Sequence, residues 1–161
     1  MIYESILDLI GNTPIIKLKQ IFDDNDIADI YVKLEFFNLG GSVKDRAALG
    51  IIEQAEKDGK LKPGGTIIEP TSGNMGISLA IIGRIKGYKT VIVMPDTMSI
   101  ERRSILKTLG AELILTDGAQ SMKGAIEKAE TLANRHRNYF MAQQFDNLAN
   151  TEAHYKTTGQ E

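Results

Sequence analysis

The fold is decided by residues 66–76, TIIEPTSGNMG, which join an expected strand to an expected helix through a tight turn. The apolar run at 66–69 predicts a buried strand, and the apolar residues from 77 to 85 predict a helix. Gly73 and Gly76 permit a sharp turn and a close approach of a ligand to the backbone. Because a helix begins with unpaired N–H groups and a partial positive charge, the stretch predicts an anion-binding site.

This site, which we call the anion seat (residues 71–76), has none of the common nucleotide-binding signatures. Neither G-x-x-x-x-G-K-[ST] nor G-x-G-x-x-G is present, so a small carboxylate or the polar edge of a cofactor suits it better than a pyrophosphate. Thr71, Ser72 and Asn74 add hydroxyl and amide donors that can recognise the shape of an anion. The alternative is an ordinary turn in which the serine and the asparagine only cap the helix.

Strands and helices alternate outward from this stretch. Strands are expected at 66–69, 89–94, 111–115 and 139–141, and helices at 43–58, 76–86, 99–109 and 120–135. Such alternation implies parallel strands with right-handed crossovers. The predicted class is therefore α/β, with an open parallel sheet, helices on both faces and ligands at the carboxyl ends of the strands.

Before the first of these helices the pattern is less regular. Residues 3–9 predict a short helix, and residues 15–18 and 30–34 predict strands. The acidic run at 23–26 is most simply a solvated loop, because a calcium loop needs a glycine and a closing glutamate at fixed offsets.

Composition narrows the class of function. The 161 residues are 42% hydrophobic and 25% charged, as in ordinary globular domains. A net charge of −2 does not favour nucleic acid or an anionic membrane as a partner. There is no cysteine, and neither His136 nor His154 has a second ligand at metal spacing, so we expect no metal site. Without a secretory signal or a membrane-spanning run, we expect a cytoplasmic protein.

A second stretch, NLGGSVKDR at residues 38–46, we call the lysine loop. Two glycines precede a helix start, with Ser42 as a candidate cap, and Lys44 falls in the first turn. The helix dipole disfavours a cation there by a few tenths to ~1 kcal/mol. The same field favours the neutral amine, which can form a Schiff base with an aldehyde. The alternative is a solvated lysine with Asp45 and Arg46 as surface charges.

Taken together, these stretches resemble the cysteine synthase (O-acetylserine sulfhydrylase) family, pyridoxal-phosphate enzymes of the tryptophan-synthase-β fold type. The resemblance is carried by N-x-x-G-S-V-K-D-R at 38–46, E-P-T-S-G-N-x-G at 69–76 and Q-F-D-N at 144–147, in this order. It extends over essentially the whole chain and includes I-G-N-T-P at 10–14. Several independent motifs in the right order are far more specific than any one of them.

The resemblance implies a transferase that replaces the acetate of O-acetylserine with sulfide to give cysteine, with pyridoxal phosphate as its cofactor. Lys44 would be the catalytic residue, because it would bind the cofactor covalently and then take the α-proton of the substrate. Asn74 would bind the 3-hydroxyl of the pyridine ring. Two alternatives stay open: a related lyase or synthase, such as cystathionine β-synthase or a sulfide-releasing cysteine lyase, and a non-catalytic module that binds an amino acid or a peptide.

The resemblance also implies how the substrate carboxylate would be held. Thr71, Ser72, Asn74 and Met75 would bind it from one side, and Gln143 would close the other. Met75 stands where the family usually has threonine, which removes one hydroxyl donor. Losing one hydrogen bond to a charged group costs roughly 1.5–3 kcal/mol if nothing replaces it. Leu39 likewise stands where the family usually has proline, a change that affects the stiffness of the loop.

Family members are considerably longer, so we expect this chain to be the N-terminal half of such an enzyme, inactive alone if the rest is required. Residues 1–36 would belong to the sheet of a larger domain, 37–148 would form a small α/β domain, and 149–161 would begin the return. The strands at 15–18 and 30–34 would then lack partners and expose apolar edges. The phosphate loop would lie in the other half. The implied partners are a second copy in a full-length homodimer and the C-terminal peptide of serine acetyltransferase.

Overall fold

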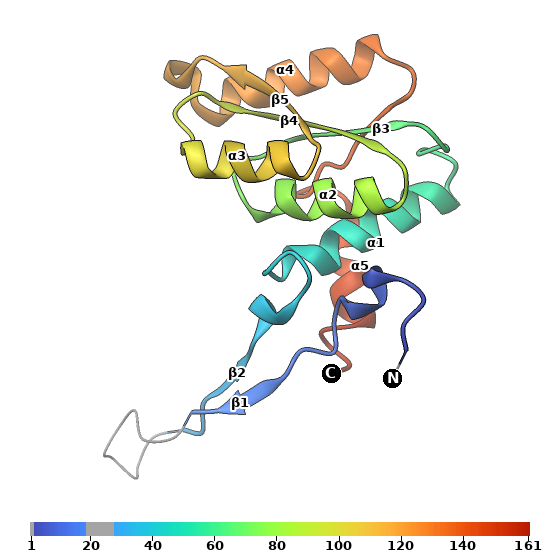
Figure 1. Ribbon diagram of the computed structural model, residues 1–161, viewed down its shortest axis with the longest axis vertical. Coiled ribbons are helices and arrows are strands. Elements are labelled where there is room, and N and C mark those ends of the chain that lie inside the picture. The colour runs from blue at the N-terminus through green and yellow to red at the C-terminus, as the bar shows by residue number, and fades with distance from the viewer. Residues whose placement is uncertain (1, 19–27) are drawn as a thin grey trace.

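The computed structural model describes residues 2–18 and 28–161, and its centre is a four-stranded sheet (Figure 1). The order of the strands is β5-β4-β3-β6, and every neighbouring pair is parallel. The strands are β3 (Thr66–Pro70), β4 (Lys89–Pro95), β5 (Glu112–Thr116) and β6 (Tyr139–Met141). The predicted α/β class and parallel sheet are confirmed. The acidic run at 23–26 lies outside the described residues.

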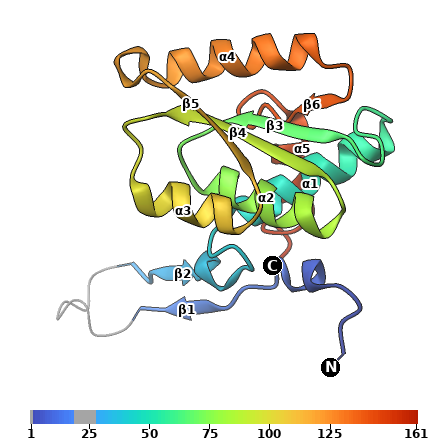
Figure 2. The same ribbon diagram turned by 45° about the horizontal axis from the view of Figure 1, so that its top comes forward.

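Helices cover both faces of this sheet, as the alternation predicts. One face carries α1 (Lys44–Lys57), α2 (Asn74–Ile85) and α3 (Ile100–Thr108), and the other carries α4 (Ser121–Arg135) (Figure 2). A fifth helix, α5 (Leu148–Lys156), packs against α1. In the part of the chain that the structure describes, three short 3-10 turns complete the elements: η1 (Ile6–Leu9), η2 (Glu35–Phe37) and η3 (Gly118–Gln120).

The ends of the helices follow local chemistry that is legible in the sequence. Gly59, Gly87 and Gly110 end α1, α2 and α3 with φ of +68°, +80° and +88°, a conformation that glycine adopts without strain. The Ser99 side chain caps α3 by accepting the N–H of Arg102 at 3.4 Å. The helix expected at 3–9 is shorter than predicted, because a capping box confines it to η1.

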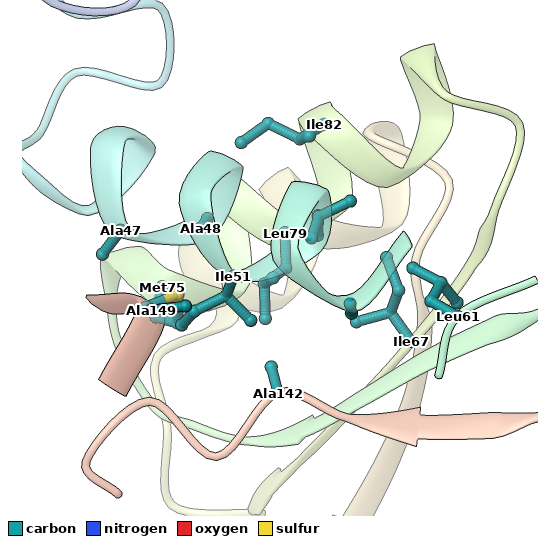
Figure 3. Close-up of a cluster of buried hydrophobic side chains, with 12 residues drawn as sticks. Ala47, Ala48, Ile51, Leu61, Ile67, Met75, Leu79, Ile82, Ala142 and Ala149 are labelled. Atoms are coloured by element: carbon teal, nitrogen blue, oxygen red, sulfur yellow. The ribbon is translucent and has the colours of Figure 1, made fainter. Parts of the chain in front are cut away.

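The largest buried cluster lies between α1, α2 and β3 (Figure 3). It includes Ile51 and Ile52 of α1, Ile67 of β3 and Leu79 of α2, each fully buried. A second cluster packs the opposite face of β3 and β4 against α4. All five residues of β3 are buried, so this strand is enclosed on both faces as expected under two helical layers.

The N-terminal part forms a separate sheet that extends away from this core (Figure 1). Its strands β1 (Ile15–Lys17) and β2 (Tyr31–Lys33) pair antiparallel with each other. The expectation that these strands lack partners is therefore wrong, because two short segments can satisfy their inner edges as a pair. Their apolar side chains are nevertheless exposed, with Ile15 at 50% and Tyr31 at 60%. Within the part of the chain that the structure describes, no helix has the length and apolarity to span a bilayer.

Candidate active site

The anion seat follows directly after β3, at the carboxyl end of a central strand. The Thr71 side chain is buried, and its hydroxyl oxygen accepts the N–H of Gly73 at 3.2 Å. Gly73 is the N-cap of α2 and has extended backbone, with no side chain capping the helix. The first turn of α2 contains no acidic residue. The N–H of Gly76 donates to the carbonyl oxygen of Gly73 at 3.1 Å, whereas among the described residues the N–H groups of Asn74 and Met75 have no partner and are left for an anion.

The side chains at the start of α2 point in different directions. Asn74 is exposed, whereas Met75 is 1% exposed and lies in the cluster against α1 (Figure 3). Met75 therefore offers only its backbone N–H to the anion seat, and its thioether contributes to packing. Gly76 lies close to the preceding turn, because a Cβ there would lie 3.0 Å from Cγ2 of Thr71 and would require that side chain to shift.

The lysine loop leads into α1, whose first residue is Lys44. The Ser42 hydroxyl accepts the N–H of Lys44 at 3.2 Å, but the N-cap of α1 is Val43 and no side chain caps the helix, so the predicted cap at Ser42 is wrong by one residue. The N–H of Gly40 donates to Asp45 Oδ2 at 2.5 Å. A Cβ at Gly40 would lie 2.5 Å from Asp45 Oδ1, so a side chain there would displace the carboxylate. The loop is thus folded around the residue that follows the lysine.

Asp45 connects the two predicted stretches. The hydroxyl of Ser78, one turn into α2, donates to Asp45 Oδ1 at 2.5 Å and lies 3.0 Å from the carbonyl oxygen of Asn74. Asp45 and Ser78 are each 1% exposed, and burial raises the pKa of the Asp45 carboxyl. The starts of α1 and α2 are therefore joined, and Figure 1 shows the two helices running side by side. Lys44 and Asn74 thus begin two adjacent helices at the same end of the sheet.

The interpretation of Asp45 and Arg46 as surface charges is wrong. The Arg46 guanidinium is 1% exposed and donates to Glu35 at 2.8 Å, to Glu161 at 2.5 Å and to the hydroxyl of Thr13 at 3.1 Å. The hydrogen bonds from Arg46 to the Glu161 carboxylate hold the pKa of Glu161 well below its usual range. Arg46 therefore ties the N-terminal segment and residue 161 to α1, a role that tertiary contacts create.

A cavity of about 240 Å³ lies at the ends of β3 and β6, beside α4. Thr71, Ser72 and Gln143 line it, so the structure brings together three of the predicted substrate-binding residues. Lys44, Asn74 and Met75 are not among its lining residues. The predicted set is therefore divided between this cavity and the adjoining helix starts.

Sequence reasoning missed three residues that shape this region: Glu69, Ser78 and Arg102. The Arg102 guanidinium of α3 donates to the carbonyl oxygen of Ser72 and so braces the turn of the anion seat. Glu69 is a carboxylate at the end of an otherwise apolar strand, and Ser78 is a polar residue among apolar neighbours in α2. A polar residue within an apolar strand or helix was the sequence signal that could have identified Glu69 and Ser78. In the part of the chain that the structure describes, no group of three metal-binding side chains is found.

The fold and the site define the class of protein. A model of the family described as pyridoxal-phosphate dependent enzyme matches residues 6–161. Because this match spans nearly all of the sequence, the chain belongs to that family.

Relatives with more specific names share much of the sequence. A cysteine synthase of Staphylococcus aureus (strain Mu50 / ATCC 700699) is 59% identical over 158 residues, which are 98% of this chain and 50% of the relative. Among solved structures, O-ureido-L-serine synthase superposes with a TM-score of 0.93 at 46% identity, over 99% of this chain and 50% of that one. A hydrogen sulfide-producing enzyme of Fusobacterium nucleatum superposes with a TM-score of 0.91 at 51% identity, over 99% and 52%. The chain spans about half the length of the relatives it matches.

Proposed function

We propose that the chain acts as part of a pyridoxal-phosphate-dependent cysteine synthase, which replaces the acetate of O-acetylserine with sulfide. The observation that carries the proposal is the hydrogen bond from Ser78 to Asp45, which joins the start of the lysine helix to the start of the helix that follows the anion seat. The 59% identity to a Staphylococcus aureus cysteine synthase supports this activity over other activities of the family.

The donors at these two helix starts fit the chemistry of pyridoxal phosphate. An aldehyde requires an amine, which Lys44 offers, and the ring hydroxyl requires a polar partner, which Asn74 offers. Among the described residues, neither side chain has a hydrogen-bond or ion-pair partner. The turn at Gly73 is open, because a Cβ there would meet only Nη1 of Arg102, at 3.8 Å. A flat ring can therefore approach the turn closely, and we propose that Lys44 and Asn74 hold the cofactor.

The chemistry divides between the cofactor and the chain. When bound, pyridoxal phosphate supplies an electron sink for the α-carbon of the amino acid. Lys44 takes the α-proton as a general base. Thr71, Ser72, Asn74 and the N–H of Met75 bind the substrate carboxylate, and Gln143 closes on it from the end of β6. Closure of the anion seat excludes water and retains the substrate while acetate leaves and sulfide adds.

The proposal extends to the rest of the protein. We propose that residues 1–36 belong to the sheet of a larger domain, that 37–148 form the small domain, and that 149–161 lead back to the larger one. The exposed apolar side chains of β1 and β2 support this division, because such surface usually marks a contact. A full-length homodimer, a cytoplasmic location and an interaction with the C-terminal peptide of serine acetyltransferase complete the proposal.

A second candidate function is release of sulfide from cysteine. It is favoured by the similarity to the hydrogen sulfide-producing enzyme of Fusobacterium nucleatum. The two functions differ in their substrates, since a cysteine synthase consumes sulfide together with O-acetylserine, whereas the lyase needs cysteine alone. Sulfide released from cysteine in the absence of O-acetylserine would favour the second function.

The test of the proposal is chemical labelling of Lys44. The chain is incubated with pyridoxal phosphate, reduced with borohydride, digested and weighed peptide by peptide. We expect the label on the peptide that contains Lys44, and little on the peptide that contains Lys57, the exposed lysine at the other end of the same helix. Label spread equally over both peptides would contradict a cofactor site. Absence of label from Lys44, together with carboxylate binding in calorimetry, would favour the non-catalytic module instead.

A further inference from the structure

Glu69 is a buried carboxylate that the proposed chemistry does not use. It lies one residue before the end of β3 and is 2% exposed. Its Oε2 accepts the N–H of Gln143 at 2.8 Å, and its Oε1 accepts the N–H of Gln144 at 3.1 Å. Within residues 2–18 and 28–161, no lysine, arginine or histidine forms an ion pair with it. The charge is therefore stabilised by two backbone amides of the loop that follows β6.

Those two amides converge because of an unusual backbone conformation. Gln143 has φ of +52°, which lies in the left-handed region. Residues other than glycine seldom adopt this conformation, and those that do are most often asparagine, aspartate or histidine. Successive N–H groups in such a turn form a concavity that binds an anion, and here the anion is Glu69 itself. Strained backbone of this kind persists only where its surroundings determine it. The two hydrogen bonds to the Glu69 carboxylate can hold Gln143 in this conformation.

The contact between Glu69 and the backbone of Gln143 lies next to the anion seat. Glu69 precedes Pro70 and Thr71 directly in sequence, so the strand that carries the carboxylate leads into the seat. Glu69, Thr71, Ser72 and Gln143 line the same cavity of about 240 Å³. The Gln143 side chain is exposed, whereas its backbone N–H is taken up by Glu69. The loop is thus held by its backbone and leaves its amide side chain available to a ligand.

We propose that Glu69 is a positioning residue, whose ionised carboxylate holds Gln143 in the left-handed conformation at the rim of the cavity that it shares with Thr71 and Ser72. Holding the loop there presents the Gln143 amide to the substrate carboxylate. This role in substrate binding rests on the proposed function. Glu69 itself touches no reacting atom in this scheme. Its effect passes through Gln143.

The pKa of Glu69 distinguishes a residue that positions the loop from one that only stabilises the fold. Burial raises the pKa of Glu69, and the hydrogen bonds from Gln144 and Gln143 only partly oppose that shift. A raised pKa means that the folded chain binds this proton more tightly than the unfolded chain does, so the contribution to stability is lost as the pH rises through the folded pKa. The ionised carboxylate therefore lowers the free energy of unfolding, and replacing Glu69 with its neutral isostere glutamine removes this destabilisation. Glutamine would, however, turn an N–H donor toward one of the two backbone donors.

The test compares amide hydrogen exchange in the ¹⁵N-labelled full chain and in Glu69→Gln, Glu69→Asp and Glu127→Gln. Glu127 is exposed on α4 and provides the matched control. In Glu69→Gln we expect exchange at Gln143 and Gln144 to accelerate at least about tenfold, while the amides of β4 exchange no faster than in the wild type. Glu69→Asp keeps the charge on a shorter side chain and should restore part of the protection. Unchanged exchange at Gln143 and Gln144 in Glu69→Gln would overturn the proposal.

A second measurement separates this inference from the proposed function. Titration of the same samples with O-acetyl-L-serine, followed by amide chemical shifts, should show at least about fivefold weaker binding in Glu69→Gln and wild-type binding in Glu127→Gln. Equal binding in Glu69→Gln and wild type would overturn the part of the proposal that presents Gln143 to substrate. If the wild-type chain binds no O-acetyl-L-serine, the proposed substrate is wrong, while the exchange data still decide whether Glu69 positions the loop.

Discussion

Replacing Ser78 with alanine removes the hydrogen bond that joins the first turns of α1 and α2. The hydroxyl donates to the buried carboxylate of Asp45 at 2.5 Å, and the side chain is 1% exposed. Without it, the N–H of Gly40 is the remaining donor to Asp45 among the described residues. Hydrogen bonds to charged groups contribute about 1.5–3 kcal/mol. We therefore expect Ser78→Ala to lower the free energy of unfolding by about 2 kcal/mol.

Urea unfolding at pH 7 measures this loss, and a double-mutant cycle with Asp45→Ala, which removes the acceptor, assigns it to the pair. We expect a coupling energy of at least about 1 kcal/mol, because the two side chains are in direct contact. Ser104→Ala is the matched control, since Ser104 is exposed on α3 and should change stability by less than about 0.5 kcal/mol. A Ser78→Ala variant as stable as the control, or a coupling energy near zero, would refute the idea that this bond holds the two helix starts together.

The same variant changes the titration of Asp45. Burial raises the pKa of this carboxyl, and the hydrogen bond from Ser78 is a cause that lowers it. Removing the serine hydroxyl should therefore raise the midpoint of the Asp45 titration, measured by carboxyl-carbon NMR. Because the folded-state pKa is raised, the contribution of Asp45 to stability is lost as the pH rises through that value. A midpoint that falls in Ser78→Ala would contradict the assignment.

Two further predictions concern packing and acid stability. Met75→Ala should cost about 2–5 kcal/mol in urea unfolding, because the side chain is 1% exposed and its removal leaves a cavity between α1 and α2; a loss below about 1 kcal/mol would mean that the cluster closes around the gap. Hydrogen bonding to Arg46 lowers the pKa of Glu161, so its contribution to stability is present above the unfolded-state pKa and is lost as the pH falls through the folded-state value. The Glu161→Gln variant should therefore lose less stability than the wild type below about pH 4.5, by up to about 1.4 kcal/mol per pH unit; parallel curves for the two proteins would contradict this.

Much of the fold was accessible from local patterns. The apolar strand at 66–69, the glycines after α1, α2 and α3, and Ser99 before α3 each act over a few residues, so their effect can be predicted without knowing the rest of the chain. The order of alternating strands and helices was enough to predict the parallel sheet. The pairing of β1 with β2 was missed, because which strand edges meet depends on how the chain returns on itself.

The candidate site was accessible only in part. Thr71, Ser72 and Gln143 were named from motifs, and the structure brings them to one cavity. The direction in which Met75 points was not predicted, since backbone position alone does not tell whether a side chain faces a ligand or the core. Glu69 was read as the end of a strand, and its two partners lie 74 and 75 residues further along the chain.

The order of residues in this chain was sufficient to predict most helix ends to within one or two residues, the burial of β3 on both faces and the turn that leads from β3 into α2. Those properties depend on hydrophobic periodicity and on capping groups within one turn of the backbone. The burial of Asp45 and Arg46, the bond from Ser78 and the carboxylate under Gln143 were decided by the tertiary structure. The energy of a charge depends on the donors and solvent that surround it, and those surroundings come from segments that are distant in sequence.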